Sequence, residues 1–196
     1  MFKVVLLGEG RVGKTSMIKQ IMKKNFTENE ISTTQASHYQ KVVKLDNRNV
    51  TLDIWDTAGQ EQYHALGPVY YRDADAAILV FDVTMKETFA MVSYSVKSWV
   101  KEISSTCEKD IVYVIAGNKV DLIETPQMEE AWQFARSIKG EYIETSAKTG
   151  INLDLLLLTV AKALVDRYET TSTTDMYSLS APLLVSEEPE SKKCCC

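Results

Sequence analysis

A glycine-rich segment near the beginning of the chain carries the residue types that hold phosphate groups in proteins. The segment GEGRVGKT, residues 8–15, fits the pattern G-x-x-x-x-G-K-[ST], with an apolar run before it and helical spacing after it. Glycines let the backbone bend so that several N–H groups point at one anion, and the helix N-terminus adds its positive end. An ordinary strand-to-helix turn is the alternative, and the direct succession Gly13, Lys14, Thr15 disfavours it.

Within this segment Lys14 is expected to reach the β- and γ-phosphates of a nucleotide and to stabilise the charge that develops during hydrolysis. Thr15 is expected to offer its hydroxyl to Mg²⁺. The predicted phosphate contacts are Gly8, Glu9, Gly10, Arg11, Val12, Gly13, Lys14, Thr15 and Ser16.

A second polar segment, DIWDTAGQE, follows an apolar run. Asp56 could bind Mg²⁺, through water because Mg²⁺ dehydrates reluctantly. The N–H of Gly59 could sense a γ-phosphate, and Gln60 could orient an attacking water. Taken singly, Asp56 is better explained as a strand-end cap and Gln60 as a solvated loop residue. The phosphate loop upstream favours the catalytic interpretation.

Two further segments, GNKVD and TSAK, have the groups that recognise guanine. The Asp121 carboxylate can accept from both N1–H and the 2-amino group, whereas adenine would leave it desolvated and unpaired. The Ala147 N–H could donate to the guanine O6, and the stems of Lys119 and Lys148 could lie along the base. N-K-x-D alone is a weak pattern, since Asn118 also suits a turn. The predicted base contacts are Asn118, Lys119, Asp121, Ser146, Ala147 and Lys148.

The elements that must position these residues alternate between apolar and amphipathic stretches. This pattern predicts an α/β fold with a six-stranded, mostly parallel sheet and helices on both faces. We expect strands over 2–8, 38–46, 49–56, 76–84, 111–121 and 141–147, with an antiparallel hairpin at DNRN, and helices over 14–26, 86–106 and 152–168. Asn152 is a plausible N-cap of the last helix. In such sheets ligands bind at the carboxyl ends of the strands, where the polar segments fall.

Composition narrows the class of protein. The chain has 196 residues and a net charge of −5, so it offers no basic footprint for nucleic acid. Its beginning lacks a signal-peptide pattern, and Cys107 stands alone, which together favour a cytosolic chain. We expect a globular domain over 1–168 and a flexible acidic tail over 169–196.

The three polar segments, with YYRDADAAILVFDVT, make the chain similar to the Rab family of the Ras superfamily, and most similar to its early-endosomal branch. The resemblance spans about residues 2–168 and implies the P-loop NTPase (small G-protein) fold and a GTP/GDP switch. It makes Thr33 the switch threonine, which would bind Mg²⁺ and the γ-phosphate only with GTP. Phe26 would pack against guanine, although a core aromatic is an equal alternative.

The resemblance also implies partners. Effectors of the GTP form would contact an aromatic surface formed by His38, Trp55 and Tyr70, where His38 stands in place of the usual Phe. An exchange factor, a GTPase-activating protein and a prenyl-binding escort or GDP-dissociation inhibitor are implied as well. Gln35 and Gln62 also depart from the family pattern, which leaves the identity of effectors and activators open. We expect a monomer that cycles between the cytosol and the cytoplasmic face of endosomal or vesicle membranes.

Gln60 and the small Gly10 predict slow GTP hydrolysis, which an activating protein would accelerate. Three alternatives are a P-loop kinase or ATPase, a GTP-binding module with negligible hydrolysis, and a structural α/β domain with a redox or metal-binding cysteine tail. Asp121 argues against the first, and Gln60 with Gly10 against the second. Adjacent cysteines have poor spacing for a tetrahedral metal site, which argues against the third.

The chain ends in KKCCC. This is not a C-a-a-X box, but it resembles Rab tails that carry two geranylgeranyl chains, here on two of Cys194, Cys195 and Cys196. Two lipids suit stable anchoring, since one gives only marginal, reversible binding. The acidic residues before the cysteines should leave little electrostatic attraction to anionic lipids.

Overall fold

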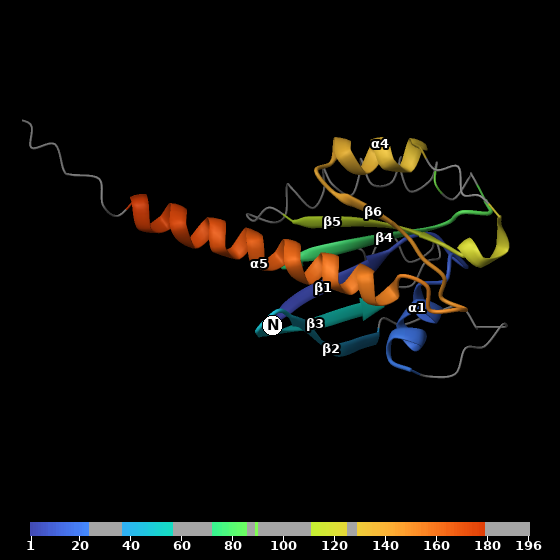
Figure 1. Cartoon of the computed structure of the whole chain (residues 1–196), viewed down its shortest axis with the longest axis horizontal. Coiled ribbons are helices and arrows are strands. Elements are labelled where there is room, and N and C mark those ends of the chain that lie inside the picture. Colours follow the sequence, from blue (N-terminus) through green and yellow to red (C-terminus); the bar gives the residue numbers. More distant parts are fainter. Residues whose placement is uncertain (24–36, 57–71, 86–88, 90–110, 125–128, 179–196) are drawn as a thin grey trace, which may run out of the picture. The chain divides into compact units, whose positions relative to one another are not determined.

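The computed structural model describes residues 1–23, 37–56, 72–85, 89, 111–124 and 129–178. Figure 1 shows their order along the chain. The elements are β1 (Phe2–Leu7), α1 (Lys14–Ile21), β2 (Ser37–Leu45), β3 (Arg48–Asp56), β4 (Ala76–Asp82), β5 (Val112–Asn118), the 3₁₀ turn η2 (Val120–Leu122), α4 (Glu129–Ser137), β6 (Glu141–Glu144) and α5 (Leu153–Ser178). This order confirms the predicted α/β class.

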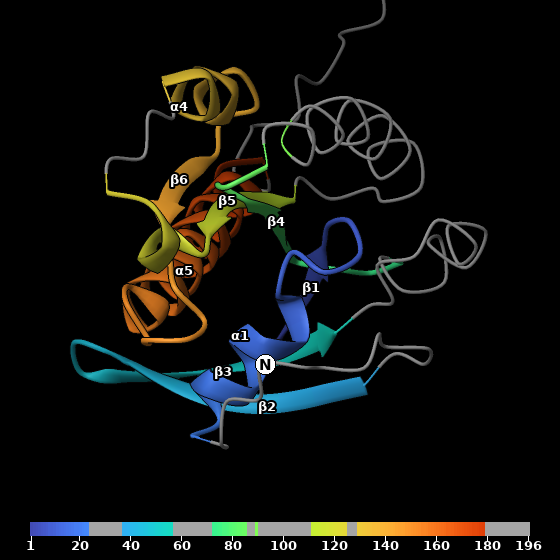
Figure 2. The same ribbon diagram turned by 90° about the vertical axis from the view of Figure 1, so that its right-hand side faces the viewer.

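The six strands form one sheet in the order β2-β3-β1-β4-β5-β6. Only β2 and β3 pair antiparallel, as the predicted hairpin requires, and the other neighbours are parallel. Because the five neighbouring strands β3, β1, β4, β5 and β6 run the same way, their carboxyl ends meet at one edge. Figure 2 looks onto this edge, with the β1–α1 loop in front of it.

Helices cover both faces of the sheet. On one face α1 packs Met17 and Ile18, and α5 packs Leu156 and Leu164, into a core with the even-numbered residues of β1. On the other face α4 packs Ala131 against a second core. The strand β4 is buried along its whole length, which is why its first six residues form an uninterrupted apolar run.

The helices α1 and α4 differ from the sequence predictions. The first helix ends at Ile21 rather than at residue 26, and Lys23 takes the left-handed conformation at φ 54°. The helix α4 was not predicted; its short apolar spacing of Ala131, Phe134 and Ala135 is the signal that could have indicated it. The predicted helix over 86–106 lies outside the described residues except for Phe89, which is helical and buried.

The last helix also runs further than expected. It continues to Ser178, ten residues beyond the predicted helix end at 168. Neither Gly nor Pro occurs between Gly150 and Pro182, so nothing in the sequence stops the helix at 168. Among the helices that the structure describes, none combines the length and apolar character needed to cross a bilayer.

Candidate nucleotide-binding site

The loop between β1 and α1 is shaped by two glycines that no other residue could replace without strain. Gly13 has φ 98°, and a Cβ there would lie 2.4 Å from Nδ2 of Asn118. Gly8 has φ 152°, and a Cβ there would lie 2.2 Å from the carbonyl oxygen of Val80. The loop is therefore pressed against the ends of β4 and β5, and its backbone conformation requires glycine.

Lys14 begins α1 with its ammonium group folded over this loop. Its Nζ donates to the carbonyl oxygens of Gly8 at 2.7 Å and Glu9 at 2.9 Å. The side chain is only 5% exposed. Burial lowers the pKa of Lys14 from 10.5 to about 8, against the opposing effect of the nearby Asp56 and Glu9 carboxylates. A buried cation at a helix N-terminus is the arrangement that an anionic ligand stabilises.

Asp56 ends β3 beside this loop and is 1% exposed. It pairs with Leu6 across β3 and β1, two residues before the loop begins, and its charge opposes the lowering of the Lys14 pKa. One buried carboxylate and one hydroxyl are the protein ligands that suit Mg²⁺, because this ion keeps several waters and takes its other ligands from phosphates. The residues present fit the predicted ion.

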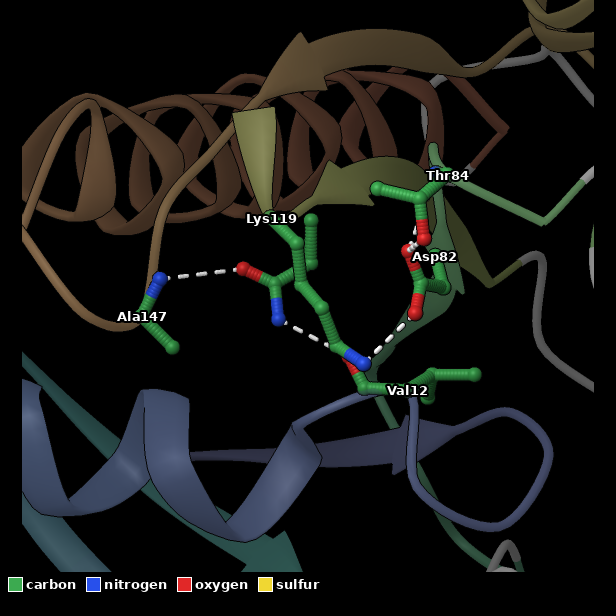
Figure 3. A network of polar contacts seen from close by, with 6 residues as sticks. Val12, Asp82, Thr84, Lys119 and Ala147 are labelled. Carbon is green, nitrogen blue, oxygen red and sulfur yellow. Dashed lines mark hydrogen bonds and ion pairs between the residues drawn. The ribbon is translucent and has the colours of Figure 1, made fainter. Parts of the chain in front are cut away.

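Asn118, at the end of β5, joins the phosphate loop to the TSAK segment. Its Nδ2 donates to the Val12 carbonyl oxygen at 2.8 Å, and its Oδ1 accepts from the Ala147 N–H at 3.0 Å (Figure 3). Asn118 is fully buried, so both bonds are shielded from water. The Ala147 N–H, which was predicted to contact guanine, thus already donates to Asn118. To bond to a guanine oxygen, it would have to donate to both acceptors or leave Asn118.

Asp121 follows β5 by three residues and is held by the TSAK segment. Its Oδ1 accepts from Ser146 Oγ at 2.5 Å, and Ser146 Oγ accepts in turn from the Thr149 N–H at 3.1 Å. Within the described residues its second oxygen carries no hydrogen bond. The hydroxyl thus orients the carboxylate that the sequence assigned to guanine, a role of Ser146 that the sequence did not reveal.

A further carboxylate, not singled out from the sequence, lies beside this edge. Asp82 ends β4, directly in register with Asn118, and its Oδ2 contacts Lys119 Nζ at 2.5 Å (Figure 3). Its Oδ1 accepts from the N–H and the hydroxyl of Thr84 at 2.9 and 2.7 Å. The available signal was its place at the end of the apolar run AAILVFD.

The predicted partner surface is polar as well as aromatic. His38 stacks on Trp55 with 5.3 Å between ring centroids and 23° between planes. Asp53 joins them, since one oxygen lies 3.1 Å from His38 Nδ1 and the other accepts from Trp55 Nε1 at 2.8 Å. The Lys3 ammonium lies 4.7 Å from the Trp55 ring centroid. The third member, Tyr70, lies outside the described residues.

The remaining predicted residues divide into two groups. Glu9, Gly10, Arg11 and Val12 complete the phosphate loop, Ser16 lies in the first turn of α1, and Lys148 follows Ala147. Phe26, Thr33, Gly59, Gln60 and the cysteines Cys194, Cys195 and Cys196 lie outside the described residues. Asn152 precedes α5 as predicted, but its side-chain amide donates to the Glu144 carbonyl oxygen at 2.8 Å and so ties the helix to β6.

The fold and this site define a P-loop nucleotide-binding protein, and comparison with known proteins identifies its family. The sequence model of the Ras family matches residues 3–166. The chain is 43% identical over 167 residues to Ras-related protein Rab-21 of Mus musculus and of Bos taurus, over 84% of this chain and 73% of each relative. The Homo sapiens protein of that name is 42% identical over 84% of this chain and 72% of the relative.

The chain belongs to the Ras family of small GTPases, and its relatives place it among the Rab proteins. The predicted resemblance, the small G-protein fold and the classification as a GTP hydrolase that serves membrane trafficking are thereby confirmed.

Proposed function

We propose that the loop over residues 8–16 holds the phosphates of GTP and GDP, and that Lys14 moves from the loop carbonyls to the β- and γ-phosphates. The observation that carries this proposal is the buried ammonium of Lys14. Among the residues that the structure describes, its hydrogen bonds go only to the neutral carbonyl oxygens of Gly8 and Glu9. A carbonyl compensates a cation less well than a charged phosphate does. Phosphate binding therefore stabilises this lysine, and the lysine stabilises the transition state of γ-phosphate transfer.

At the other end of the site, Asp121 reads the N1–H and the amino group of guanine. Its orientation by Ser146 supports this role, because a carboxylate held in place loses less freedom on binding. Asn118 keeps the phosphate loop and the base segment at a fixed separation through its bonds to Val12 and Ala147. Lys119 and Lys148 cover the base with their aliphatic stems, and Phe26 closes it at the edge.

Thr15, Thr33 and Asp56 hold Mg²⁺, directly or through water. The ion, when bound, neutralises part of the phosphate charge that develops during hydrolysis. Asp56 supports this role by its burial beside Lys14, since an acidic side chain there completes the charge balance of the site. Gln60 orients the attacking water, and Thr33 and Gly59 contact the γ-phosphate and are released when it leaves.

The GTP form binds effectors through His38, Trp55 and Tyr70. The Asp53 carboxylate, which is shared between the first two rings, supports a surface of fixed geometry that would select partners. An exchange factor, a GTPase-activating protein and an escort or GDP-dissociation inhibitor act on the same monomer. The chain consists of a globular domain over 1–168 and a tail over 169–196. Prenylation of the terminal cysteines anchors the tail to the cytoplasmic face of endosomal membranes. Extraction by the GDP-dissociation inhibitor returns the chain to the cytosol.

A single-turnover assay tests the catalytic part of this proposal. The protein is loaded with GTP carrying a radiolabelled γ-phosphate, and phosphate release is followed after Mg²⁺ is added. We expect slow release by the wild type and almost none by Gln60→Leu, because the leucine cannot orient water. Equal release from both would contradict the role of Gln60. The proposed recognition of guanine is tested by competition: GTP and GDP should displace the bound labelled nucleotide, and ATP should not.

A further inference from the structure

Asp82 and Lys119 form an ion pair at the edge where guanine is proposed to bind. The two charged atoms lie 2.5 Å apart, and the side chains are 3% and 31% exposed. The register explains the contact, because Asp82 pairs with Asn118 across β4 and β5 and Lys119 is the next residue. The pair is therefore built by the sheet itself.

The carboxylate of Asp82 is fixed independently of the lysine. Thr84 donates to its Oδ1 twice, through its N–H at 2.9 Å and its hydroxyl at 2.7 Å. These bonds turn Oδ2 toward Lys119, as Figure 3 shows. A carboxylate that is oriented by two donors and is only 2% exposed is a rigid anchor for a cation.

Lys119 is held at both ends as a result. Its backbone takes the left-handed conformation at φ 70°, and the following N–H, of Val120, donates to the Thr145 carbonyl oxygen at 3.2 Å. At the far end Asp82 holds the ammonium. A lysine side chain normally loses much rotamer freedom when it is ordered by a ligand, and here that cost is met before any ligand binds.

We propose that Asp82 is a positioning residue for nucleotide binding: it holds the ammonium of Lys119 so that the lysine stem is already in place along the guanine base. Thr84 orients Asp82 for this purpose. The inference rests on the proposed contact between Lys119 and the base. The alternative is that Asp82 only stabilises the turn into Thr84 and has no bearing on the nucleotide.

A double-mutant cycle separates these two roles. The full-length protein and its variants Asp82→Asn, Lys119→Met and the double variant are loaded with a fluorescent GDP analogue, and its release into excess GDP is timed. We expect Asp82→Asn to release it about tenfold faster than the wild type, as for coupled neighbours of this kind. Lys119→Met should accelerate release at least as much, and the double variant should be no faster than Lys119→Met.

Thr84→Val keeps the carboxylate and removes one of its donors, so it should accelerate release by a smaller factor, about threefold. The matched control is Asp75→Asn, at the other end of β4, where the carboxylate accepts from the Lys3 N–H at 2.9 Å. It should leave the release rate unchanged.

Two results would overturn the inference, and they differ. If Lys119→Met releases the analogue at the wild-type rate, the proposed base contact fails and the inference fails with it. If Lys119→Met accelerates release but Asp82→Asn does not, or if the two effects multiply in the double variant, the base contact stands and the positioning role of Asp82 is wrong.

Discussion

A carboxylate can fix the protonation of a neighbouring side chain, and His38 on the proposed partner surface is the clearest case. An ionised carboxylate only accepts hydrogen bonds, so the Asp53 oxygen 3.1 Å from Nδ1 requires the proton of the neutral ring to sit on Nδ1. The exposed Nε2 is then an acceptor. A phenylalanine at this position would offer no hydrogen-bond acceptor, so a surface with phenylalanine would select different partners from a surface with His38.

Asp53→Asn should reverse this arrangement. The asparagine keeps an oxygen for Trp55 Nε1–H and turns its NH₂ group toward His38, which moves the imidazole proton to Nε2. Long-range ¹H–¹⁵N correlation spectra of the wild type and of Asp53→Asn, recorded at a pH where the ring is neutral, report which nitrogen is protonated. His64, the second histidine of the chain, serves as the internal reference. An unchanged His38 spectrum would show that Asp53 does not set the tautomer.

Lys14 should make the affinity for GDP depend on pH. Its pKa in the free protein is about 8, and anionic phosphates favour the charged form, so nucleotide binding raises the pKa. Binding then takes up protons above pH 8, and GDP affinity should fall as pH rises from 8 to 10, by up to about tenfold per unit. Below pH 8 the lysine is charged in both states and the affinity should be flat.

Isothermal titration in buffers of different ionisation enthalpy measures this proton uptake directly. Lys14→Arg is the matched control, because arginine stays charged throughout the range. Its GDP affinity should be weaker but insensitive to pH between about 7 and 8.5, the range in which guanine keeps the N1–H that Asp121 accepts from. A wild-type affinity that does not change above pH 8 would mean that Lys14 is not the group that meets the phosphates.

At the scale of elements, the site depends on how closely the β1–α1 loop approaches the end of β5. Gly13→Ala places a methyl group 2.4 Å from Nδ2 of Asn118 and forces alanine to take a positive φ. The strain is about 1–3 kcal/mol, which corresponds to a loss of GDP affinity of about five- to 150-fold. Equilibrium binding of the fluorescent GDP analogue measures the loss.

Gly140→Ala provides the comparison for this substitution. A Cβ there would lie 2.7 Å from the carbonyl oxygen of Tyr113, so it also forces the backbone to shift, but in the turn between α4 and β6. Its melting temperature should fall without a specific loss of GDP affinity. Equal loss of affinity in both variants would mean that Gly13 acts through general stability alone.

At the scale of the whole molecule, the proposed anchor is lipid rather than charge. The final residues carry Lys192 and Lys193 next to three glutamates at 187, 188 and 190. Doubly prenylated protein should therefore bind neutral vesicles and vesicles with anionic lipid to within about threefold of each other, since each uncompensated basic residue is worth about 1 kcal/mol at such a surface. Vesicle flotation with quantified protein tests this expectation.

Two variants sharpen that test. Replacing the three glutamates by glutamine should raise binding to anionic vesicles alone, because the lysines are then uncompensated. Replacing all three terminal cysteines by serine should abolish binding to both. Binding of the cysteine-free variant to either vesicle would contradict the lipid anchor.

The sequence determined the chemistry of this protein because its patterns are local. The order of the phosphate loop, NKVD and TSAK, and the alternation of apolar runs with amphipathic stretches, predicted the fold, the family and the residue types at the site. A loop motif between a strand and a helix needs only neighbouring residues to be recognised. The extent of α1, the helix α4 and the continuation of α5 were not predicted, since element ends depend on weak propensities and on packing.

The tertiary structure alone decided which side chains meet across the sheet. Asp82 and Lys119 are far apart in sequence, and only the register of β4 and β5 brings the carboxylate to the lysine. The same holds for Asn118 with Val12 and for Asp53 with His38, which depend on strand order and on hairpin register. Long-range pairing leaves no periodic trace in the sequence, so the contacts that position the recognised residues become visible only in the folded chain.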